Sequence, residues 1–377
     1  MKTQIKNMGR RIPLIDLKQQ YRSIKEEIDS AIKGVIDAQE FIMGREVKLF
    51  EEEMAKFCDA NFAIGVSSGT DALILSLKAI DIKQGEEVIT TPFTFMATAG
   101  AITNSGGTPV FCDIDPETYN IDPEEIKRRM SDRTRAIIPV HLYGQCADMD
   151  KILEVGRANK LTVIEDCAQA IGATYKGRKA GSMGQAGAIS FFPSKNLGAF
   201  GDGGMVVTNN KDLASKLKLM REHGSSKKYV HSIVGTNSRL DNLQAAILRV
   251  KLKVLDSWAE SRRKNALLYN ECFKNSGVTT PYVPGHNVHV YHQYIIRVKD
   301  SKRDSLAQHL ENLGVASRVY YPIPLHLQEC YKSLNGKEGD FPHAEEAART
   351  TLAVPVYPGL KEDEISRIAD SIKSFLK

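Results

Sequence analysis

Lys195 is the residue whose type and surroundings most clearly allow covalent chemistry. It follows the apolar residues Phe191 and Phe192 and precedes a glycine-rich turn at residues 201–204. Apolar neighbours exclude water, and desolvation lowers the pKa of a lysine until its neutral amine becomes available as a nucleophile. Lys195 could therefore form a Schiff base with an aldehyde. A solvated loop lysine is the alternative, and the short motif alone favours that alternative.

Two adjacent carboxylates, Glu165 and Asp166, end a run of apolar residues at 161–164. A buried carboxylate is costly unless a cation meets it, and a protonated pyridine nitrogen would be such a cation. Because side chains alternate along a strand, we expect Asp166 to face this cation and Glu165 to point to the opposite side. A helix cap, or a buried ion pair with Arg or Lys, is the alternative role for Asp166.

Gly69 and Thr70 lie where a predicted strand gives way to a predicted helix. The first turn of a helix presents unpaired N–H groups and the positive end of the helix dipole, and both attract a phosphate. The hydroxyl of Ser190, five residues before Lys195, could reach the same phosphate. Helix capping is far commoner than ligand binding, so a plain N-cap is the alternative for this turn.

Phe95 follows another predicted strand and could lie flat on a cofactor ring, although core packing is the usual role of a phenylalanine. An amine, a carboxylate, an aromatic ring and a phosphate cradle together fit one ligand, pyridoxal 5′-phosphate. The chain lacks the G-x-x-x-x-G-K motif of P-loop NTPases, and no G-x-G-x-x-G motif opens its first helix. Their absence argues against a P-loop NTPase and a Rossmann dehydrogenase.

The elements that must position these residues show the alternation of an α/β protein. Helix-period segments, such as residues 72–80 and 151–159, separate short apolar runs. Strands that are buried on both faces and separated by helices predict a mostly parallel sheet, with ligands at the carboxyl ends of its strands. Seven strands are predicted, at residues 62–67, 87–91, 108–113, 135–141, 162–166, 188–192 and 204–208.

The pattern of predicted helices and strands changes after about residue 245. A helix is predicted around residues 21–35, before the strands, and a long helical stretch at residues 240–268 follows them. A strand, a helix and a terminal helix are then predicted at residues 291–298, 305–313 and 362–376. We therefore expect a large α/β cofactor-binding domain at residues 1–250 and a smaller α+β domain at residues 251–377.

Composition narrows the class of protein further. The 377 residues include 51 Lys and Arg and 46 Asp and Glu, interspersed, which gives little support to nucleic-acid binding. The six scattered cysteines show no zinc-ligand spacing, so we expect free thiols and no metal. Residues 1–6 lack the apolar run of a signal peptide, and no apolar stretch approaches a membrane span. A cytoplasmic protein without a membrane segment is expected.

The motifs, in their order along nearly the whole chain, resemble those of the DegT/StrS-type sugar aminotransferases, which are fold-type I pyridoxal-phosphate enzymes. The matching segments are residues 65–73 (GVSSGTDAL), 91–95 (TPFTF), 139–144 (PVHLYG), 165–169 (EDCAQ), 190–204 (SFFPSKNLGAFGDGG) and 235–241 (GTNSRLD). The resemblance implies a seven-stranded, mostly parallel sheet with helices on both faces and a smaller C-terminal α+β domain. It also implies a homodimer with shared active sites.

The resemblance further implies a role for each site residue. Lys195 would carry the Schiff base, Asp166 would pair with the pyridine nitrogen, Gln169 would approach the phenolic oxygen and Phe95 would stack on the ring. The residues implied to bind the phosphate are Gly69, Thr70 and Asp71 through their backbone, Ser190 through its hydroxyl, and Asn237 across the dimer interface.

The resemblance implies two substrates, L-glutamate and a UDP- or dTDP-linked keto-hexose, with pyridoxamine phosphate formed between the two stages. Residues 193–204 match a pattern typical of relatives that aminate C3, so a 3-keto sugar is expected, for a surface polysaccharide, lipopolysaccharide or glycosylated metabolite. A C4-keto sugar, a cyclitol ketone and a non-catalytic regulator remain alternatives. The implied sugar contacts are Arg239, Tyr321, His326 and Tyr320, which stands where many relatives have histidine.

Overall fold

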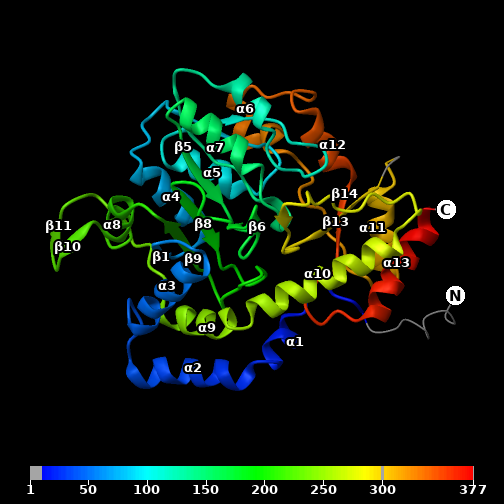
Figure 1. Cartoon of the computed structure of the whole chain (residues 1–377), viewed down its shortest axis with the longest axis horizontal. Coiled ribbons are helices and arrows are strands. Elements are labelled where there is room, and N and C mark those ends of the chain that lie inside the picture. The colour runs from blue at the N-terminus through cyan, green and yellow to red at the C-terminus, as the bar shows by residue number, and fades with distance from the viewer. Residues whose placement is uncertain (1–10, 299–300, 377) are drawn as a thin grey trace.

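The computed structural model describes residues 11–298 and 301–376 (Figure 1). Residues 1–6, on which the expectation of no signal peptide rests, lie outside this range. The centre of the molecule is a seven-stranded sheet with the order β1-β9-β8-β5-β4-β2-β3. Its strands are β1 Phe62–Val66, β2 Glu87–Thr90, β3 Thr108–Phe111, β4 Thr134–Ile137, β5 Thr162–Asp166, β8 Ala186–Ser190 and β9 Gly204–Thr208.

All seven predicted strands are confirmed, and so is the mostly parallel sheet. Strands β3, β2, β4, β5 and β8 pair in parallel, whereas β9 runs antiparallel to both β8 and β1. The carboxyl ends of β1, β2, β4, β5 and β8 therefore meet at one edge of the sheet. The candidate residues follow these ends.

Helices cover both faces of the sheet because its strands alternate between two apolar clusters. On β5, Val163 belongs to the apolar cluster that also contains residues of α3 (Arg45–Phe57), α7 (Met149–Ala158) and α9 (Asn242–Leu252). The next residue, Ile164, belongs to the cluster on the other face, with residues of α4 (Gly69–Ala79), α5 (Met96–Asn104) and α8 (Lys211–Met220). Burial on both faces explains the continuous apolar runs of the sequence.

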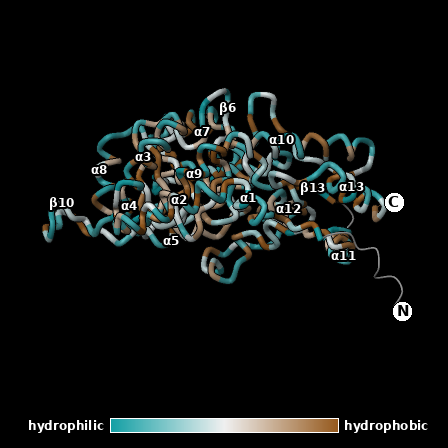
Figure 2. The backbone as a smooth tube through the Cα atoms, turned by 90° about the horizontal axis from the view of Figure 1, so that it is seen from below, coloured by the Kyte–Doolittle hydropathy of each residue, from teal (hydrophilic) through white to brown (hydrophobic). Residues whose placement is uncertain are grey.

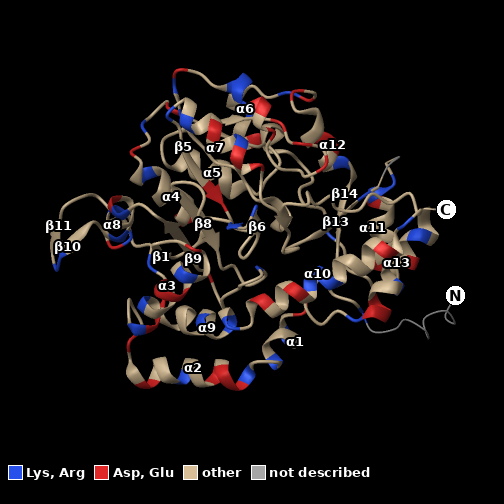
Figure 3. Ribbon diagram, in the orientation of Figure 1, with Lys and Arg blue, Asp and Glu red and all other residues tan. Residues whose placement is uncertain are grey.

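The predicted N-terminal helix is α2 (Lys25–Ala38), preceded by the short α1 (Leu17–Arg22). The buried side chains of Ile24 and Ile28 pack against Ile247 of α9, which explains the apolar stripe. The opposite side of α2 carries charges of both signs, and Figure 3 shows such interspersed charges on many helices. The hairpin of β10 (Ser225–Lys227) and β11 (Val230–His231) projects from the body in Figures 1 and 2.

The C-terminal elements build a separate apolar cluster. Helix α10 (Leu255–Cys272) packs on α13 (Glu362–Leu376), and β13 (Tyr294–Arg297) pairs antiparallel with β14 (Thr351–Val354), next to α11 (Arg303–Asn312). The helical stretch predicted at residues 240–268 consists of two helices, because the backbone leaves helical geometry at Val254 (φ −111°, ψ 1°) between α9 and α10. This break lets α9 follow the sheet while α10 follows the C-terminal cluster.

The proposed division into domains at residue 250 falls near this break between α9 and α10. Ile12 bridges to Val315 and joins the C-terminal cluster, so we assign the first described residues to the smaller domain. The six cysteines are free, as predicted. Among the described residues, no helix has both the length and the apolar composition needed to cross a bilayer.

Candidate active site

A cavity of about 380 Å³ opens at the carboxyl edge of the sheet. It brings together most of the residues singled out in the sequence, although they come from five separate segments of the chain. The predicted residues that line the cavity are Gly69, Thr70, Phe95, Asp166, Gln169, Ser190, Lys195, Tyr320 and Tyr321. Convergence of these residues on one cavity is the geometry that the proposed cofactor requires.

Lys195 reaches this cavity from a tight loop between β8 and β9. The loop is closed by backbone hydrogen bonds from the N–H of Lys195 to the carbonyl of Phe192 and from the N–H of Ala199 to the carbonyl of Phe191, each 2.8 Å. A Cβ on Gly198 would lie 2.3 Å from the Pro193 carbonyl oxygen, so this position requires glycine. Desolvation lowers the pKa of Lys195 to about 8, and the carboxylate of Asp166 opposes this shift.

This lowered pKa predicts how the reactivity of Lys195 depends on pH. In the cofactor-free protein, acylation of Lys195 by an uncharged reagent should rise about fivefold from pH 7 to pH 8 and less than about twofold from pH 8 to pH 9. The neutral amine forms as pH rises through the pKa, so the rate increases with pH and then levels off. Mass spectrometry of the Lys195 peptide measures the rate. A tenfold rise over each unit would indicate an ordinary lysine and contradict the prediction.

Asp166 ends β5 with its carboxylate turned into the site. The hydroxyl of Thr98 donates to Oδ2 at 2.8 Å, and the N–H of Ala168 donates to Oδ1 at 3.1 Å. Burial raises the pKa of Asp166, whereas these hydrogen bonds and the charge of Lys195 lower it. Thr98 was not singled out in the sequence, since only the fold brings α5 against the end of β5.

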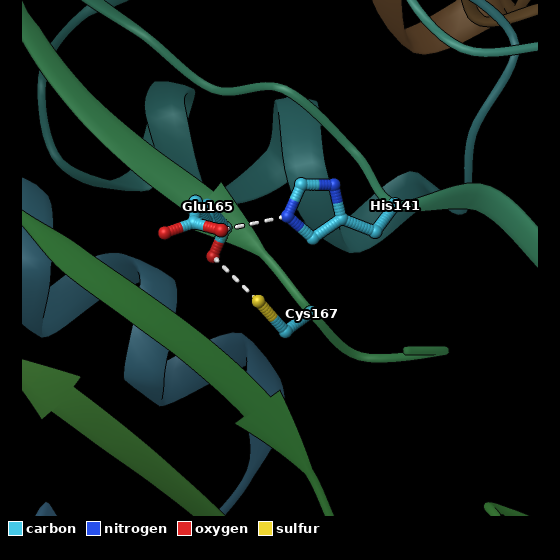
Figure 4. A group of neighbouring side chains, drawn as sticks. All are labelled: His141, Glu165 and Cys167. Carbon is cyan, nitrogen blue, oxygen red and sulfur yellow. Dashed lines mark hydrogen bonds and ion pairs between the residues drawn. The ribbon is translucent and has the colours of Figure 1, made fainter. Parts of the chain in front are cut away.

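Glu165 points to the opposite side of β5, as predicted, and is completely buried. Figure 4 shows its side chain next to those of His141 and Cys167. His141 Nδ1 accepts a hydrogen bond from the Ala147 N–H at 3.2 Å, so the Nε2–H group donates to Glu165 Oε2 at 2.8 Å. The Cys167 thiol contacts the Glu165 carbonyl oxygen at 3.8 Å. The carboxylate also accepts the N–H groups of Gly181, Met183 and Gly184.

Hydrogen bonds among His141, Glu165 and Cys167 hold the end of β5 in position. The potential ligand atoms lie within 4.8 Å of one another, but hydrogen bonds of the protein already occupy both oxygens of Glu165. The backbone N–H of His141 donates to the Asp166 carbonyl at 3.0 Å, which links the group to the cavity. His141 and Glu165 lie within two motifs of the sequence, at residues 139–144 and 165–169. These motifs do not show that the two side chains are in contact.

The first turn of α4 lies against Ser190. A Cβ added to Gly69 would come within 2.6 Å of the Ser190 Cβ, so the absence of a side chain keeps this corner of the cavity open. Ser68 caps the helix by accepting the N–H of Asp71 at 3.0 Å, and the Asp71 carboxylate accepts the Ser238 hydroxyl at 3.0 Å. Asp71 therefore faces away from the cavity, and the turn combines the N-cap with an open anion cradle.

Gln169, Phe95 and Tyr321 form one wall of the cavity. Gln169 accepts the N–H of Tyr143 at 2.7 Å and donates to the Tyr321 hydroxyl at 3.0 Å, which fixes the orientation of its amide. The ring of Phe95 lies 6.2 Å from the ring of Tyr321 and is 58% exposed. An exposed phenylalanine at the mouth of a cavity is available to stack on a ligand ring.

Four predicted residues do not line the cavity within one chain: Asp71, as described above, and Asn237, Arg239 and His326. Asn237 is exposed and forms a bridge with Glu222, and Arg239 has a buried Nε without a hydrogen-bond partner. His326 is buried, and its Nε2 lies 3.1 Å from Glu345 Oε1. A short 3-10 helix at Leu325–Leu327 turns His326 inward, away from the cavity. The role predicted for Asn237 concerns a neighbouring protomer.

Known proteins share this architecture along nearly the whole chain. The model of the DegT/DnrJ/EryC1/StrS aminotransferase family matches residues 22–373. The chain is similar to S. venezuelae DesV, whose crystal structure holds a ketimine intermediate, with a TM-score of 0.95, 39% identity and coverage of 98% of this chain and 99% of that chain.

The named relatives include one regulatory protein and two sugar aminotransferases. The chain is 47% identical to a "pleiotropic regulatory protein" of Geobacillus stearothermophilus, over 97% of this chain and 99% of the relative. It is 43% identical to the UDP-N-acetyl-3-dehydro-alpha-D-glucosamine 3-aminotransferase of Acidithiobacillus ferrooxidans, over 97% and 98%. It is 40% identical to the dTDP-3-amino-3,4,6-trideoxy-alpha-D-glucose transaminase of Streptomyces venezuelae, over 97% and 96%.

The sheet, the lysine and carboxylate at its edge, and these similarities define a fold-type I, pyridoxal-phosphate-dependent aminotransferase. The amine, carboxylate, exposed aromatic ring and open cradle of the cavity fit this cofactor. The chain belongs to the DegT/DnrJ/EryC1/StrS aminotransferase family.

Proposed function

We propose that this chain transfers the amino group of L-glutamate to the C3 keto carbon of a UDP- or dTDP-linked hexose. The observation that carries the proposal is the cavity in which Lys195 and Asp166 lie together at the carboxyl edge of the sheet. Two relatives named for amination at C3 and the match of residues 193–204 to the C3 pattern support the choice of carbon.

We assign the chemistry to Lys195 and Asp166. Bound pyridoxal phosphate supplies an aldehyde and a ring that accepts the electron pair released at the reacting carbon. Lys195 would hold the cofactor, and its amine, when free, would move a proton between the donor carbon that gives up nitrogen and the cofactor carbon that receives it. A pKa of about 8 allows Lys195 to take up and release this proton near neutral pH. Asp166 keeps the ring nitrogen protonated.

We assign cofactor binding to the residues around this pair. The open corner between Gly69, Thr70 and Ser190 suits the phosphate, because helix N–H groups and a hydroxyl converge there. Phe95 provides the stacking surface, and Gln169 orients the phenolic oxygen. Asp71 supports the phosphate turn indirectly, since Ser68 already takes its N–H group.

We also propose that the protein is a homodimer in which each active site contains residues of both protomers. Phe192 and Phe200 are large apolar residues with exposed fractions of 53% and 46%, and Phe192 lines the cavity. Cover by a second copy would remove this apolar surface from water. Asn237 would then reach the partner's phosphate site, and Arg239 its nucleotide. We assign sugar contacts to Tyr320 and Tyr321, whereas His326 lies too far inside the protein to serve without rearrangement.

The alternatives differ in the acceptor or in the absence of catalysis. Amination of a C4-keto sugar or a cyclitol ketone would use the same Lys195 and Asp166. A regulatory role is suggested by the name of the Geobacillus relative, but the retained lysine and carboxylate support catalysis. Because free cysteines are typical of proteins in the reducing cytoplasm, we propose that this protein is cytoplasmic.

The two half-reactions test the proposal separately. L-glutamate should remove the visible absorption of the lysine-bound cofactor, and a 3-keto nucleotide sugar should restore it at least about tenfold faster than its 4-keto isomer, a difference of about 1.4 kcal/mol. Stopped-flow spectroscopy of the holoenzyme measures both steps. No change with glutamate would support the regulator, and faster recovery with the 4-keto isomer would overturn the assignment to C3.

A further inference from the structure

His292 lies beside Lys195 but plays no part in the site described so far. It follows the short strand β12 (Asn287–Val288), comes from the C-terminal half of the chain and lines the cavity. Only 8% of the residue is exposed. Its imidazole ring contacts the side chain of Asn196, the neighbour of Lys195 in sequence.

The hydrogen bonds of Asn196 determine which nitrogen of His292 carries the proton. Asn196 Nδ2 donates to the carbonyl of Val290 at 3.0 Å, so Asn196 Oδ1 faces the imidazole. This oxygen lies 3.2 Å from His292 Nδ1 and can only accept a hydrogen bond. Nδ1 must therefore carry hydrogen, and Nε2 of the neutral ring keeps a free lone pair.

The free lone pair of His292 opens to the cavity. Among residues 11–298 and 301–376, no group hydrogen-bonds to Nε2, yet this nitrogen is not one of the unpartnered polar atoms sealed from solvent. Because His292 lines the cavity, its accessible nitrogen reaches that space. Burial, with the charges of Lys195 and Arg262, lowers the pKa of His292 well below its usual value, so the ring stays neutral at neutral pH.

A neutral acceptor discriminates between the two substrates of an aminotransferase. A lone pair accepts a hydrogen bond from a hydroxyl but repels the lone pairs of a carboxylate oxygen. Apart from the amino group that is transferred, L-glutamate presents two carboxylates, whereas a sugar presents hydroxyls. We propose that His292 Nε2 accepts a hydrogen bond from a hydroxyl of the acceptor sugar and is a specificity-determining residue of the second half-reaction. This inference rests on the proposed function.

Two substitutions test the roles of the two imidazole nitrogens of His292 separately. His292→Asn keeps an amide donor near the position of Nδ1 for Asn196 but removes the acceptor in the cavity. His292→Gln places an amide oxygen near the position of Nε2. We expect His292→Asn to lower kcat/KM for the keto sugar about 30-fold while the glutamate half-reaction changes less than about twofold, and His292→Gln to recover most of the loss.

His289→Asn is the matched control, because His289 is a buried histidine of the same segment that does not line this cavity. Its Nδ1 accepts the N–H of Tyr291 at 2.8 Å, a bond that asparagine can retain. Both half-reactions should be nearly unchanged in this variant. Equal losses in both half-reactions of His292→Asn would show that His292 acts on Lys195, and no loss would exclude a sugar contact. Either result would overturn the inference.

The tautomer of His292 can be measured without any sugar. In holoenzyme carrying ¹⁵N-labelled histidine, the resonance that disappears in His292→Asn should report a protonated Nδ1 and an unprotonated Nε2 from pH 6 to pH 9. A protonated Nε2 would overturn the inference, whatever the substrate is. If the wild-type enzyme accepts glutamate but no keto sugar, the proposed function fails, and the hydroxyl assigned to His292 fails with it, even when the nitrogen resonances are as expected.

Discussion

Lys195→Ala is expected to lower kcat for amino transfer from L-glutamate about 10³-fold or more, because alanine removes both the covalent attachment and the group that moves the proton. The cavity should still bind the cofactor through the cradle of Gly69 and Ser190. Single-turnover kinetics measures the loss. Borohydride reduction followed by peptide mass spectrometry measures the attachment, which should be found on Lys195 in the wild-type enzyme and be absent in the variant.

Lys251 provides a matched control for this prediction. Burial lowers its pKa to about 8 as well, but its ammonium group contacts the Gly198 carbonyl and the ring of Phe200 and does not line the cavity. Lys251→Met should therefore keep the covalent attachment at Lys195 and retain activity within about tenfold. Attachment at Lys251, or transamination by Lys195→Ala at more than about a tenth of the wild-type rate, would contradict the assignment.

Asp166→Asn is expected to lower kcat about 10² to 10³-fold, because a neutral amide cannot hold the ring nitrogen in its protonated form. Asparagine is close to aspartate in shape and can still accept the N–H of Ala168 and bond with the Thr98 hydroxyl. The glutamate half-reaction, followed by the loss of visible absorption, should therefore slow while cofactor attachment remains.

The stability of the cofactor-free protein separates this effect from misfolding. Burial raises the pKa of Asp166 above its value in the unfolded chain, so the charged carboxylate costs stability as pH rises through that range. Asp166→Asn should thus melt at the same temperature as the cofactor-free wild type at pH 7, or higher. A lower melting temperature together with lost activity would indicate a structural role for Asp166 instead.

The sheet was predictable because its strands are buried on both faces and produce continuous apolar runs. The ends of these runs also located Asp166 and Gly69, since ligands lie at the carboxyl ends of parallel strands. Individual side-chain contacts between distant segments were not predictable. Thr98 lies 68 residues from Asp166, and His292 lies 96 residues from Asn196, so no local pattern relates them.

Local motifs also do not determine the direction in which a side chain points. His326 follows the tyrosine pair of the cavity by a few residues, yet a 3-10 helix turns it toward Glu345. Asp71 belongs to the phosphate turn, but its carboxylate bonds with Ser238 on the side away from the cavity. Backbone geometry over three or four residues decided both cases, and sequence spacing contains little information on it.

Transfer of isotope-labelled nitrogen tests the central claim most directly. The holoenzyme is incubated with ¹⁵N-labelled L-glutamate and a 3-keto nucleotide sugar, and the product is examined by NMR. The account predicts an amino sugar in which ¹⁵N is bonded to C3. A product labelled at another carbon, or the absence of ¹⁵N from the sugar while glutamate is consumed, would contradict it.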